Sequence, residues 1–407
     1  MEGDFIKINE WLLPLSWLYG LAVRLRNFCY DVGLLKSRAF RVPVISVGNI
    51  TVGGTGKTPH VEYLVSLLKN RVPVAVLSRG YKRKTRGFLV AAADCTARDV
   101  GDEPCQMKHK FPDVTVAVDG RRTRGIDTLT ANDADLGAVL LDDAFQHRAV
   151  KPGINILLVD YHRLIIYDRL LPAGRLREPL KGKDRADIVI VTKCPSDLKP
   201  MEYRIISKAM NLYPYQQLFF TTLAYDNLQP LFPAEAASLE SRDTAGSPSP
   251  DTAAHGVPLS AIRSHAVLLL TGIASPRQMT EDLKPLAASI EPLAFPDHHA
   301  FSRKDVERIN AAFAALPEPR CVITTEKDAV RLSALNGLSE DVRQHIYSLP
   351  VRVRFMLDEE EKFNENIIGY VRKNSRNSIL AKRKDENISQ DRHYSGDGTR
   401  TISFRNN

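Results

Sequence analysis

The sequence has few cysteines and no close pair of them. Its five cysteines are Cys29, Cys95, Cys105, Cys194 and Cys321, and none of them belongs to a Cys-x-x-Cys motif. An odd number of scattered cysteines predicts neither a disulfide framework nor a zinc site, and it favours a reducing cytoplasm.

A hydrophobic run long enough to cross a bilayer is also missing. The most apolar stretch near the N-terminus covers residues 11–23, whereas a spanning helix needs roughly 20 apolar residues. Glu2, Asp4 and Glu10 precede this stretch, and no clean small-residue cleavage site follows it. Both features argue against a secretory signal peptide.

The same stretch has the composition of a segment that lies in a membrane interface. It contains Trp11 and Trp17 and leads into Arg24 and Arg26, and aromatic side chains beside basic ones suit the boundary between lipid and water. The alternative is an ordinary core-packing helix that is interrupted near Pro14.

The overall composition is that of a folded protein with an acidic partner. The chain has 407 residues, 43% of them hydrophobic and 26% charged, which predicts two folded domains rather than one. The net charge of +8 fits phosphate, nucleic acid or an anionic membrane, and it does not distinguish among them.

Short apolar strands alternate with helical segments, first between residues 42 and 192 and again after residue 265. Continuous apolar strands that alternate with helices predict parallel sheets covered on both faces, and hence an α/β fold. The expected strands cover 42–47, 73–78, 114–118, 138–143, 154–160, 187–192, 265–272 and 321–325.

The strongest motif is GNITVGGTGKTPH at 48–60, between an expected strand and an expected helix. That context is typical of a P-loop, in which glycines let backbone N–H groups converge on a phosphate. Lys57 would reach the β- and γ-phosphates, and the Thr58 hydroxyl would help to hold Mg²⁺. Thr51 stands where the strict pattern has glycine, so a merely tight turn is the alternative. The expected phosphate-binding residues are Thr51, Val52, Gly53, Gly54, Thr55, Gly56, Lys57 and Thr58.

Two carboxylates end the expected strand 138–143. Asp142 and Asp143 have the position of a Walker B acid, which holds the metal of a P-loop enzyme, although aspartate at a strand end is also a common turn residue. A guanine-reading motif is lacking, because Pro195 stands two residues after Lys193, where such a motif has aspartate. ATP is therefore the expected nucleotide.

Seven motifs follow one another along the chain: GNITVGGTGKTP (48–59), SRGYKRK (78–84), GDEP (101–104), LLDDAFQH (140–147), LPAGRLREP (171–179), FPDHHAF (295–301) and TTEKDAVRL (324–332). Together they resemble the tetraacyldisaccharide 4′-kinase family. The resemblance implies a P-loop kinase that uses ATP and Mg²⁺ to phosphorylate the 4′-hydroxyl of an acylated disaccharide 1-phosphate, a lipid A precursor. It also implies a monomer at the cytoplasmic face of the inner membrane, with no nucleic acid as partner.

The resemblance assigns catalytic roles by position. Asp102 in GDEP matches the base that acts on the sugar hydroxyl, and His298 would pair with it and orient it, with His299 as the rival. Asp102 as a simple helix cap is the alternative. SRGYKRK and Lys327–Asp328 receive no catalytic role: the first would be a basic loop that touches lipid or phosphate, and the second a structural or nucleotide-side position.

Further charged residues would surround the phosphates. Arg177 would offset developing charge, and Glu178 would orient Mg²⁺ or its water, unless the two are a surface ion pair. Arg122 is the arginine that matches the family, with Arg121 and Arg124 as rivals on what would otherwise be a solvated basic face.

The expected organisation has four parts, and two other functions compete with the kinase. A membrane-recruited nucleotide switch would bind ATP or GTP without phosphorylating an acceptor, and a soluble P-loop ligase or small-metabolite kinase would use residues 11–26 as a core helix. The parts are an N-terminal membrane-associated helical segment (1–40), a P-loop kinase domain (41–225), a smaller α/β domain (226–370, with a flexible insertion at 234–256) and a disordered basic tail (371–407).

Overall fold

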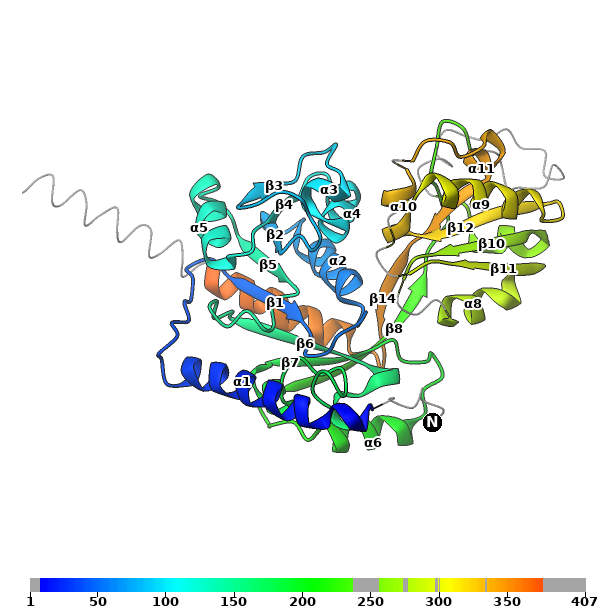
Figure 1. Ribbon diagram of the computed structural model, residues 1–407. Coiled ribbons are helices and arrows are strands. Elements are labelled where there is room, and N and C mark those ends of the chain that lie inside the picture. Colours follow the sequence, from blue (N-terminus) through cyan, green and yellow to red (C-terminus); the bar gives the residue numbers. More distant parts are fainter. Residues whose placement is uncertain are drawn as a thin grey trace, which may run out of the picture.

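The computed structural model describes residues 8–236, 256–273, 277–296, 299, 301–333 and 335–375. Two sheets organise this part of the chain, a nine-stranded large sheet and a five-stranded small sheet (Figure 1). The large sheet has the order β14 (Val351–Phe355), β8 (Gln217–Tyr225), β7 (Ile188–Thr192), β6 (Ile154–Asp160), β1 (Val44–Gly48), β5 (Ala138–Asp142), β2 (Val74–Ser78), β4 (Thr115–Val118) and β3 (Leu89–Val90). The small sheet has the order β11 (Ser289–Ala294), β10 (Ala266–Thr271), β12 (Arg320–Thr325), β13 (Ile346–Leu349) and β9 (Gln229–Pro230).

Both sheets are parallel in their interior, and antiparallel strands form both edges of the large sheet and one edge of the small sheet, whose other edge strand β11 is parallel to β10. In the large sheet β14 and β3 run antiparallel to β8 and β4, and in the small sheet β9 runs antiparallel to β13. Strands β1, β2, β5 and β7 are buried along their whole length, as expected for parallel strands covered on both faces. The α/β prediction is confirmed.

Helices cover the faces of each sheet. Those associated with the large sheet are α1 (Leu13–Asp31), α2 (Lys57–Leu68), α3 (Ala97–Val100), α4 (Asp102–Lys110), α5 (Arg122–Asn132) and α6 (Pro200–Met210). The small sheet is associated with α8 (Arg277–Leu283), α9 (Arg303–Ala314), α10 (Glu326–Leu332) and α11 (Glu340–His345).

The chain returns to the large sheet after it completes the small one. The predicted second domain, 226–370, included β14 and most of a helix over 360–375, but β14 pairs with β8. Phe363, Ile367 and Val371 of that helix are buried in the core of the large sheet. The apolar side chains of this helix need an apolar partner, and the core of the large sheet supplies it. The second domain therefore does not extend to residue 370 as predicted, because β14 and the helix over 360–375 belong with the large sheet. Of the predicted insertion and tail, residues 237–255 and 376–407 lie outside the described residues.

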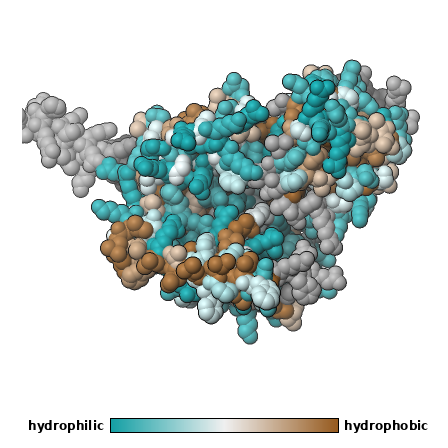
Figure 2. Space-filling view, in the orientation of Figure 1, coloured by the Kyte–Doolittle hydropathy of each residue, from teal (hydrophilic) through white to brown (hydrophobic). Residues whose placement is uncertain are grey.

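Helix α1 lies along the outside of the large sheet with its apolar side outward (Figures 1 and 2). Ser16 and Gly20 face the protein, and the Ser16 hydroxyl donates to the Leu170 carbonyl at 2.9 Å. Trp17 and Leu21 are 79% and 62% exposed, so α1 is not a core helix. Pro14 occupies the first turn, where proline does not interrupt a helix. Within the described ranges, no helix has the length and apolarity that crossing a bilayer would require.

Candidate active site

The adjacent strands β1, β5, β2 and β4 bring polar residues to one edge of the large sheet. These strands are parallel, so their carboxyl ends meet there. Val47 pairs with Asp142, and Leu77 pairs with Leu141. This register places Asp142 and Asp143 beside both Ser78 and the turn that follows Gly48.

The turn between β1 and α2 has the backbone that a phosphate-binding loop needs. Gly53 and Gly56 have φ values of 125° and 76°, a region that side chains with a Cβ atom rarely adopt. Gly56 caps α2, so Lys57 and Thr58 stand at the positive end of that helix.

Neighbouring segments hold this turn in place. The Asn49 side-chain amide donates to the Thr55 hydroxyl at 2.9 Å, and the Thr192 hydroxyl donates to the Thr55 carbonyl at 3.0 Å. Lys193 donates to the Gly54 carbonyl and to Asp160, the latter at 2.9 Å. In the sequence, Lys193 marked only the place where a guanine-reading motif is lacking. Its hydrogen bonds to the phosphate-binding turn and to Asp160 depend on the fold.

Arg177 reaches the turn through backbone pairing. The Arg177 N–H donates to the Ile50 carbonyl at 2.7 Å, and the Val52 N–H donates to the Arg175 carbonyl at 2.8 Å. The Asp143 carboxylate consequently lies between two cations, with Oδ1 3.6 Å from Lys57 Nζ and Oδ2 3.7 Å from Arg177 Nη1. Asp143 itself has a left-handed φ of 47°, which turns its side chain out of the strand.

Asp142 is buried and lacks a full set of partners. The Ser78 hydroxyl donates to its Oδ2 at 3.0 Å, while Oδ1 is buried without a hydrogen-bond partner among the described residues. Burial first, and then the charges of Glu103 and Asp143, raise the pKa of Asp142 to about 7, against the lowering effect of Lys57. A carboxylate in such a position has the donor chemistry that Mg²⁺ prefers.

Glu103 is a site residue that the sequence analysis missed. It stands next to Asp102 in the GDEP motif, and it is the largest charged contribution to the pKa of Asp142. Its place beside Asp102 in the GDEP motif was the only signal that the sequence offered.

Arg122 is the one of the three candidate arginines that enters the site. It is 2% exposed and donates to the Asp119 carbonyl at 3.0 Å and to the Asp142 carbonyl at 3.3 Å. Burial lowers the pKa of Arg122 to about 10, against the raising effect of Asp142 and Asp143. Arg124, whose side chain is exposed, instead pairs with the buried Asp119 carboxylate at 2.8 Å.

Glu178 has partners other than the predicted metal residues. Its Oε2 accepts from Arg185 at 2.9 Å and from Asn27 of α1 at 3.3 Å. The side chain is buried, and Oε1 has no hydrogen-bond partner within the described part of the chain. Glu178 is therefore in a buried ion pair, not a surface one, and its predicted role toward Mg²⁺ stays a prediction.

Asp102 begins α4 and is bound by an arginine from the small sheet. Arg331 of α10 donates from Nε to Asp102 Oδ1 at 3.0 Å and from Nη2 to Oδ2. The helix cap is Gly101, so capping does not account for Asp102. Arg331 belongs to the TTEKDAVRL motif, but nothing in the sequence paired it with Asp102.

His298, the predicted partner of Asp102, lies outside the described residues. His299, the rival, has a different partner: its Nε2 is 3.0 Å from Asp305 Oδ2, and its ring stacks on Phe295. Asp328 is structural, since it is fully buried and accepts from the Gly272 N–H at 2.8 Å.

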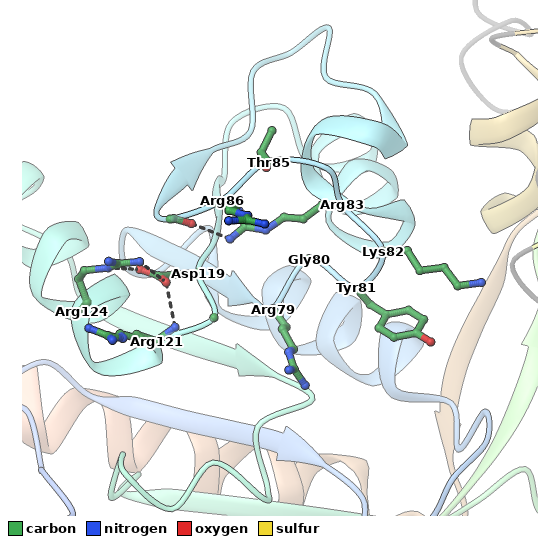
Figure 3. A pocket seen from close by; sticks show the side chains of 12 residues that line it. Arg79, Gly80, Tyr81, Lys82, Arg83, Thr85, Arg86, Asp119, Arg121 and Arg124 are labelled. Atoms are coloured by element: carbon green, nitrogen blue, oxygen red, sulfur yellow. Dashed lines mark hydrogen bonds and ion pairs between the residues drawn. The ribbon is translucent and has the colours of Figure 1, made fainter.

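A basic pocket adjoins the site (Figure 3). Among the described residues that line it, Asp119 is the one with a carboxylate, and Arg124 and the Arg121 N–H both donate to it. Beside the pocket, His147 Nε2 is buried without a hydrogen-bond partner among the described residues, and burial followed by Arg122, Arg26 and Arg79 lowers the pKa of His147 to about 4. The basic residues that line the pocket are Arg79, Lys82, Arg83, Arg86, Arg121 and Arg124.

Comparison with known proteins identifies the family. A model of the family described as tetraacyldisaccharide-1-P 4′-kinase, LpxK, matches residues 8–372. The tetraacyldisaccharide 4′-kinases of Phocaeicola vulgatus and Bacteroides thetaiotaomicron are 56% and 51% identical, over 93% and 96% of this chain and 99% and 100% of theirs. The crystal structure of LpxK from Aquifex aeolicus in complex with ATP superposes with a TM-score of 0.66 at 30% identity, covering 88% of this chain and 98% of that one. These matches confirm the resemblance seen in the motifs, and the chain belongs to the tetraacyldisaccharide-1-P 4′-kinase family.

Proposed function

We propose that this protein transfers the γ-phosphate of ATP to the 4′-hydroxyl of a tetraacyldisaccharide 1-phosphate at the cytoplasmic face of the inner membrane. The observation that carries the proposal is the position of Asp143 between Lys57 and Arg177, beside the glycine turn of a chain in this family. Phosphoryl transfer depends mainly on positioning and charge stabilisation, and this edge of the sheet offers both.

The nucleotide would bind on the turn formed by residues 51–58. Backbone N–H groups and the start of α2 would bind the phosphates, and Lys57 would contact the β- and γ-phosphates. Thr58 and Asp142, with Asp143 close by, would hold Mg²⁺, and the unpartnered Oδ1 of Asp142 is the observation that supports such a fit. The bound ion supplies charge neutralisation on the phosphate oxygens.

Asp102 would act as the base toward the sugar hydroxyl. Asp102 is the first residue of α4, and Glu103, the next residue, raises the pKa of Asp142. The start of α4 would therefore face both the sugar hydroxyl and the metal-binding aspartate. Arg331 would fix the direction of the Asp102 carboxylate with its two hydrogen bonds. Arg122 and Arg177 would stabilise the charge that develops on the transferred phosphoryl group. His298 remains a proposed partner of Asp102.

The lipid would reach the site from the side of α1. The exposed apolar side chains of this helix support its insertion into the membrane interface, where such side chains leave water. Arg26 of α1 and Arg79 of the basic pocket both act on the pKa of His147, so positive charge extends from the helix to the site. The 1-phosphate would bind in that basic pocket, where arginine can contact phosphate oxygens in pairs.

A single chain would suffice for catalysis. Residues from both sheets meet at Asp102 and Arg331 within one copy, which supports a monomer.

The deciding experiment supplies the purified full-length protein with Mg²⁺, ATP and a disaccharide-1-phosphate lipid in detergent. The expected product gains one phosphate by mass, ATP consumption depends on the lipid, and Lys57→Ala forms far less product in the same time. Equal ATP consumption with and without lipid, and no change in the mass of the lipid, would instead support the nucleotide switch.

A further inference from the structure

A cluster of two thiols and an imidazole lies where the loop before α3 meets α4, away from the phosphate-binding turn. Cys95 Sγ is 3.6 Å from Cys105 Sγ, and Cys105 Sγ is 3.9 Å from His109 Nε2. One ligand atom from each of the three residues lies within 4.8 Å of the ligand atoms of the other two, so the three side chains could share one metal ion.

We propose that Cys95, Cys105 and His109 form a binding site for one thiophilic d¹⁰ cation of the Zn²⁺ or Cd²⁺ type, with water in the fourth position. Sulfur at about 2.3 Å and nitrogen at about 2.0 Å from a tetrahedral ion lie about 3.8 Å (S···S) and about 3.5 Å (S···N) from each other. The observed separations of 3.6 Å and 3.9 Å differ from these edges by only a few tenths of an ångström.

The local structure brings the three groups together for reasons that the sequence spacing hides. Cys105 and His109 are four residues apart on α4, so they share one face of the helix. Cys95 precedes α3, and the Cys105 thiol donates to the Cys95 carbonyl at 3.0 Å, which holds the loop against the helix. Both thiols are buried while His109 is exposed, so the histidine marks the side from which an ion and its water would enter.

The chemistry of the ligands selects the cation. The two thiols and the imidazole offer two sulfur donors and one nitrogen donor. Binding replaces the two thiol protons, which leave to solvent, with two metal–thiolate bonds. Only a soft or borderline cation forms thiolate bonds strong enough for that exchange, and Mg²⁺, a hard cation, does not.

The site would act on the helix that carries the proposed base. Asp102 and Cys105 lie one turn apart on α4, and the charge of Asp102 reaches the Cys105 thiol. A bound ion would join the segment before α3 to the second turn of α4. It would thereby fix the start of the helix on which Asp102 and Glu103 stand.

The test titrates full-length, metal-free, reduced protein with Cd²⁺ in the presence of excess Mg²⁺ and no nucleotide. Thiolate-to-metal charge-transfer absorbance is expected to saturate at one ion per chain. His109→Gln, on the exposed side of α4, is expected to weaken binding by at least about tenfold, and Cys95→Ser and Cys105→Ser to abolish the absorbance band. His162→Gln and Cys194→Ser, which lie outside the cluster, serve as matched controls and should bind as the wild type does.

The proposal is overturned if His109→Gln binds Cd²⁺ as tightly as the wild type, or if the wild type shows no saturable band. Should Cys105→Ser fail to fold, His109→Gln and Cys95→Ser decide the matter. Asp142→Asn should leave the band unchanged, and loss of the band in that variant would assign the ion to the phosphate-binding site and contradict the proposal.

Discussion

Arg331 binds Asp102 through both carboxylate oxygens and thereby connects α10 of the small sheet to α4 of the large sheet. The two side chains are only 9% and 13% exposed. Lys110 of α4 adds a second link through its contact with Glu326 of α10 at 2.7 Å. The residue proposed as the base is thus positioned by the part of the chain that packs beside the phosphate-binding sheet.

Arg331→Gln should lower turnover by at least about tenfold and leave the KM for ATP nearly unchanged, because Asp102 would lose its orientation while the turn at 51–58 stays intact. Removal of one partner from a buried pair should also destabilise the fold by about 3 kcal/mol. Arg331→Lys keeps the charge but not the planar fork, so it should restore part of the turnover. Steady-state kinetics and denaturant unfolding would measure both effects.

A matched control exists at the surface, where Arg343 pairs with Glu235 and the two side chains are 33% and 38% exposed. Arg343→Gln should cost less than about 1 kcal/mol and leave turnover unchanged. Equal losses in the two variants, or a raised KM for ATP in Arg331→Gln, would contradict the positioning role of Arg331.

Lys57→Ala and Asp143→Ala should each lower turnover by roughly 10²–10³-fold or more without unfolding the protein. The reason is that Lys57 and Asp143 lie 3.6 Å apart at the mouth of the turn, where their charges face the expected phosphates and metal. Far-UV circular dichroism should match the wild type, and near-normal turnover in either variant would rule out the proposed site.

The stability of the metal-free protein should fall as pH rises toward neutrality, in part because of Asp142. Burial raises the pKa of Asp142 from 3.8 to about 7, so between these values the folded state holds a proton that the unfolded state has released. Stability then decreases across that range and levels off above about pH 7. Asp142→Asn removes this cost, and thermal unfolding should show it gaining over the wild type by a few kcal/mol at pH 8 and by less at pH 5.

At limiting Mg²⁺ the activity of the wild type should show the opposite trend and rise with pH up to about 7, because the ionised form of Asp142 is the one that would bind the metal. Asp142→Asn should be inactive at every pH. A stability gain that does not change with pH would contradict the assigned titration. Glu62, whose pKa burial also raises to about 7, is present in both proteins and cancels in the comparison.

Replacing the outward side chains of α1 should reduce membrane binding without loss of folding. Trp17→Ser with Leu21→Ser removes two side chains that are 79% and 62% exposed, so little packing is lost. Each buried large apolar side chain is worth about 1.5–3 kcal/mol, and the vesicle-bound fraction should fall by at least about tenfold. Co-sedimentation with anionic vesicles measures this fraction.

Val90→Ser is the control, because Val90 is an exposed apolar residue that does not belong to α1. It is 43% exposed on β3, an edge strand of the large sheet. This variant should bind vesicles as the wild type does. Unchanged binding of the α1 variant would show that this helix does not enter the membrane.

The sequence by itself determined the features that depend on near neighbours in the chain. Apolar runs such as 154–160 predicted buried parallel strands, and the glycines around Lys57 predicted a phosphate-binding turn, because strand burial and loop conformation follow from local residue types. The pairing of Asp142 with that turn followed from the shared direction of the strands. Asp102 and Arg122 could be named from the sequence because each stands in a short segment that matches the family.

Only the tertiary structure decided which distant residues meet. The contact between Arg331 and Asp102, the return of β14 to the large sheet and the approach of Cys95 to Cys105 depend on how helices pack and which strand edges remain open. The scattered cysteines predicted no zinc site, because motifs such as Cys-x-x-Cys record only the spacing of residues along the chain. Side-chain chemistry depends on distance in space, and folding sets that distance through contacts that no short segment encodes.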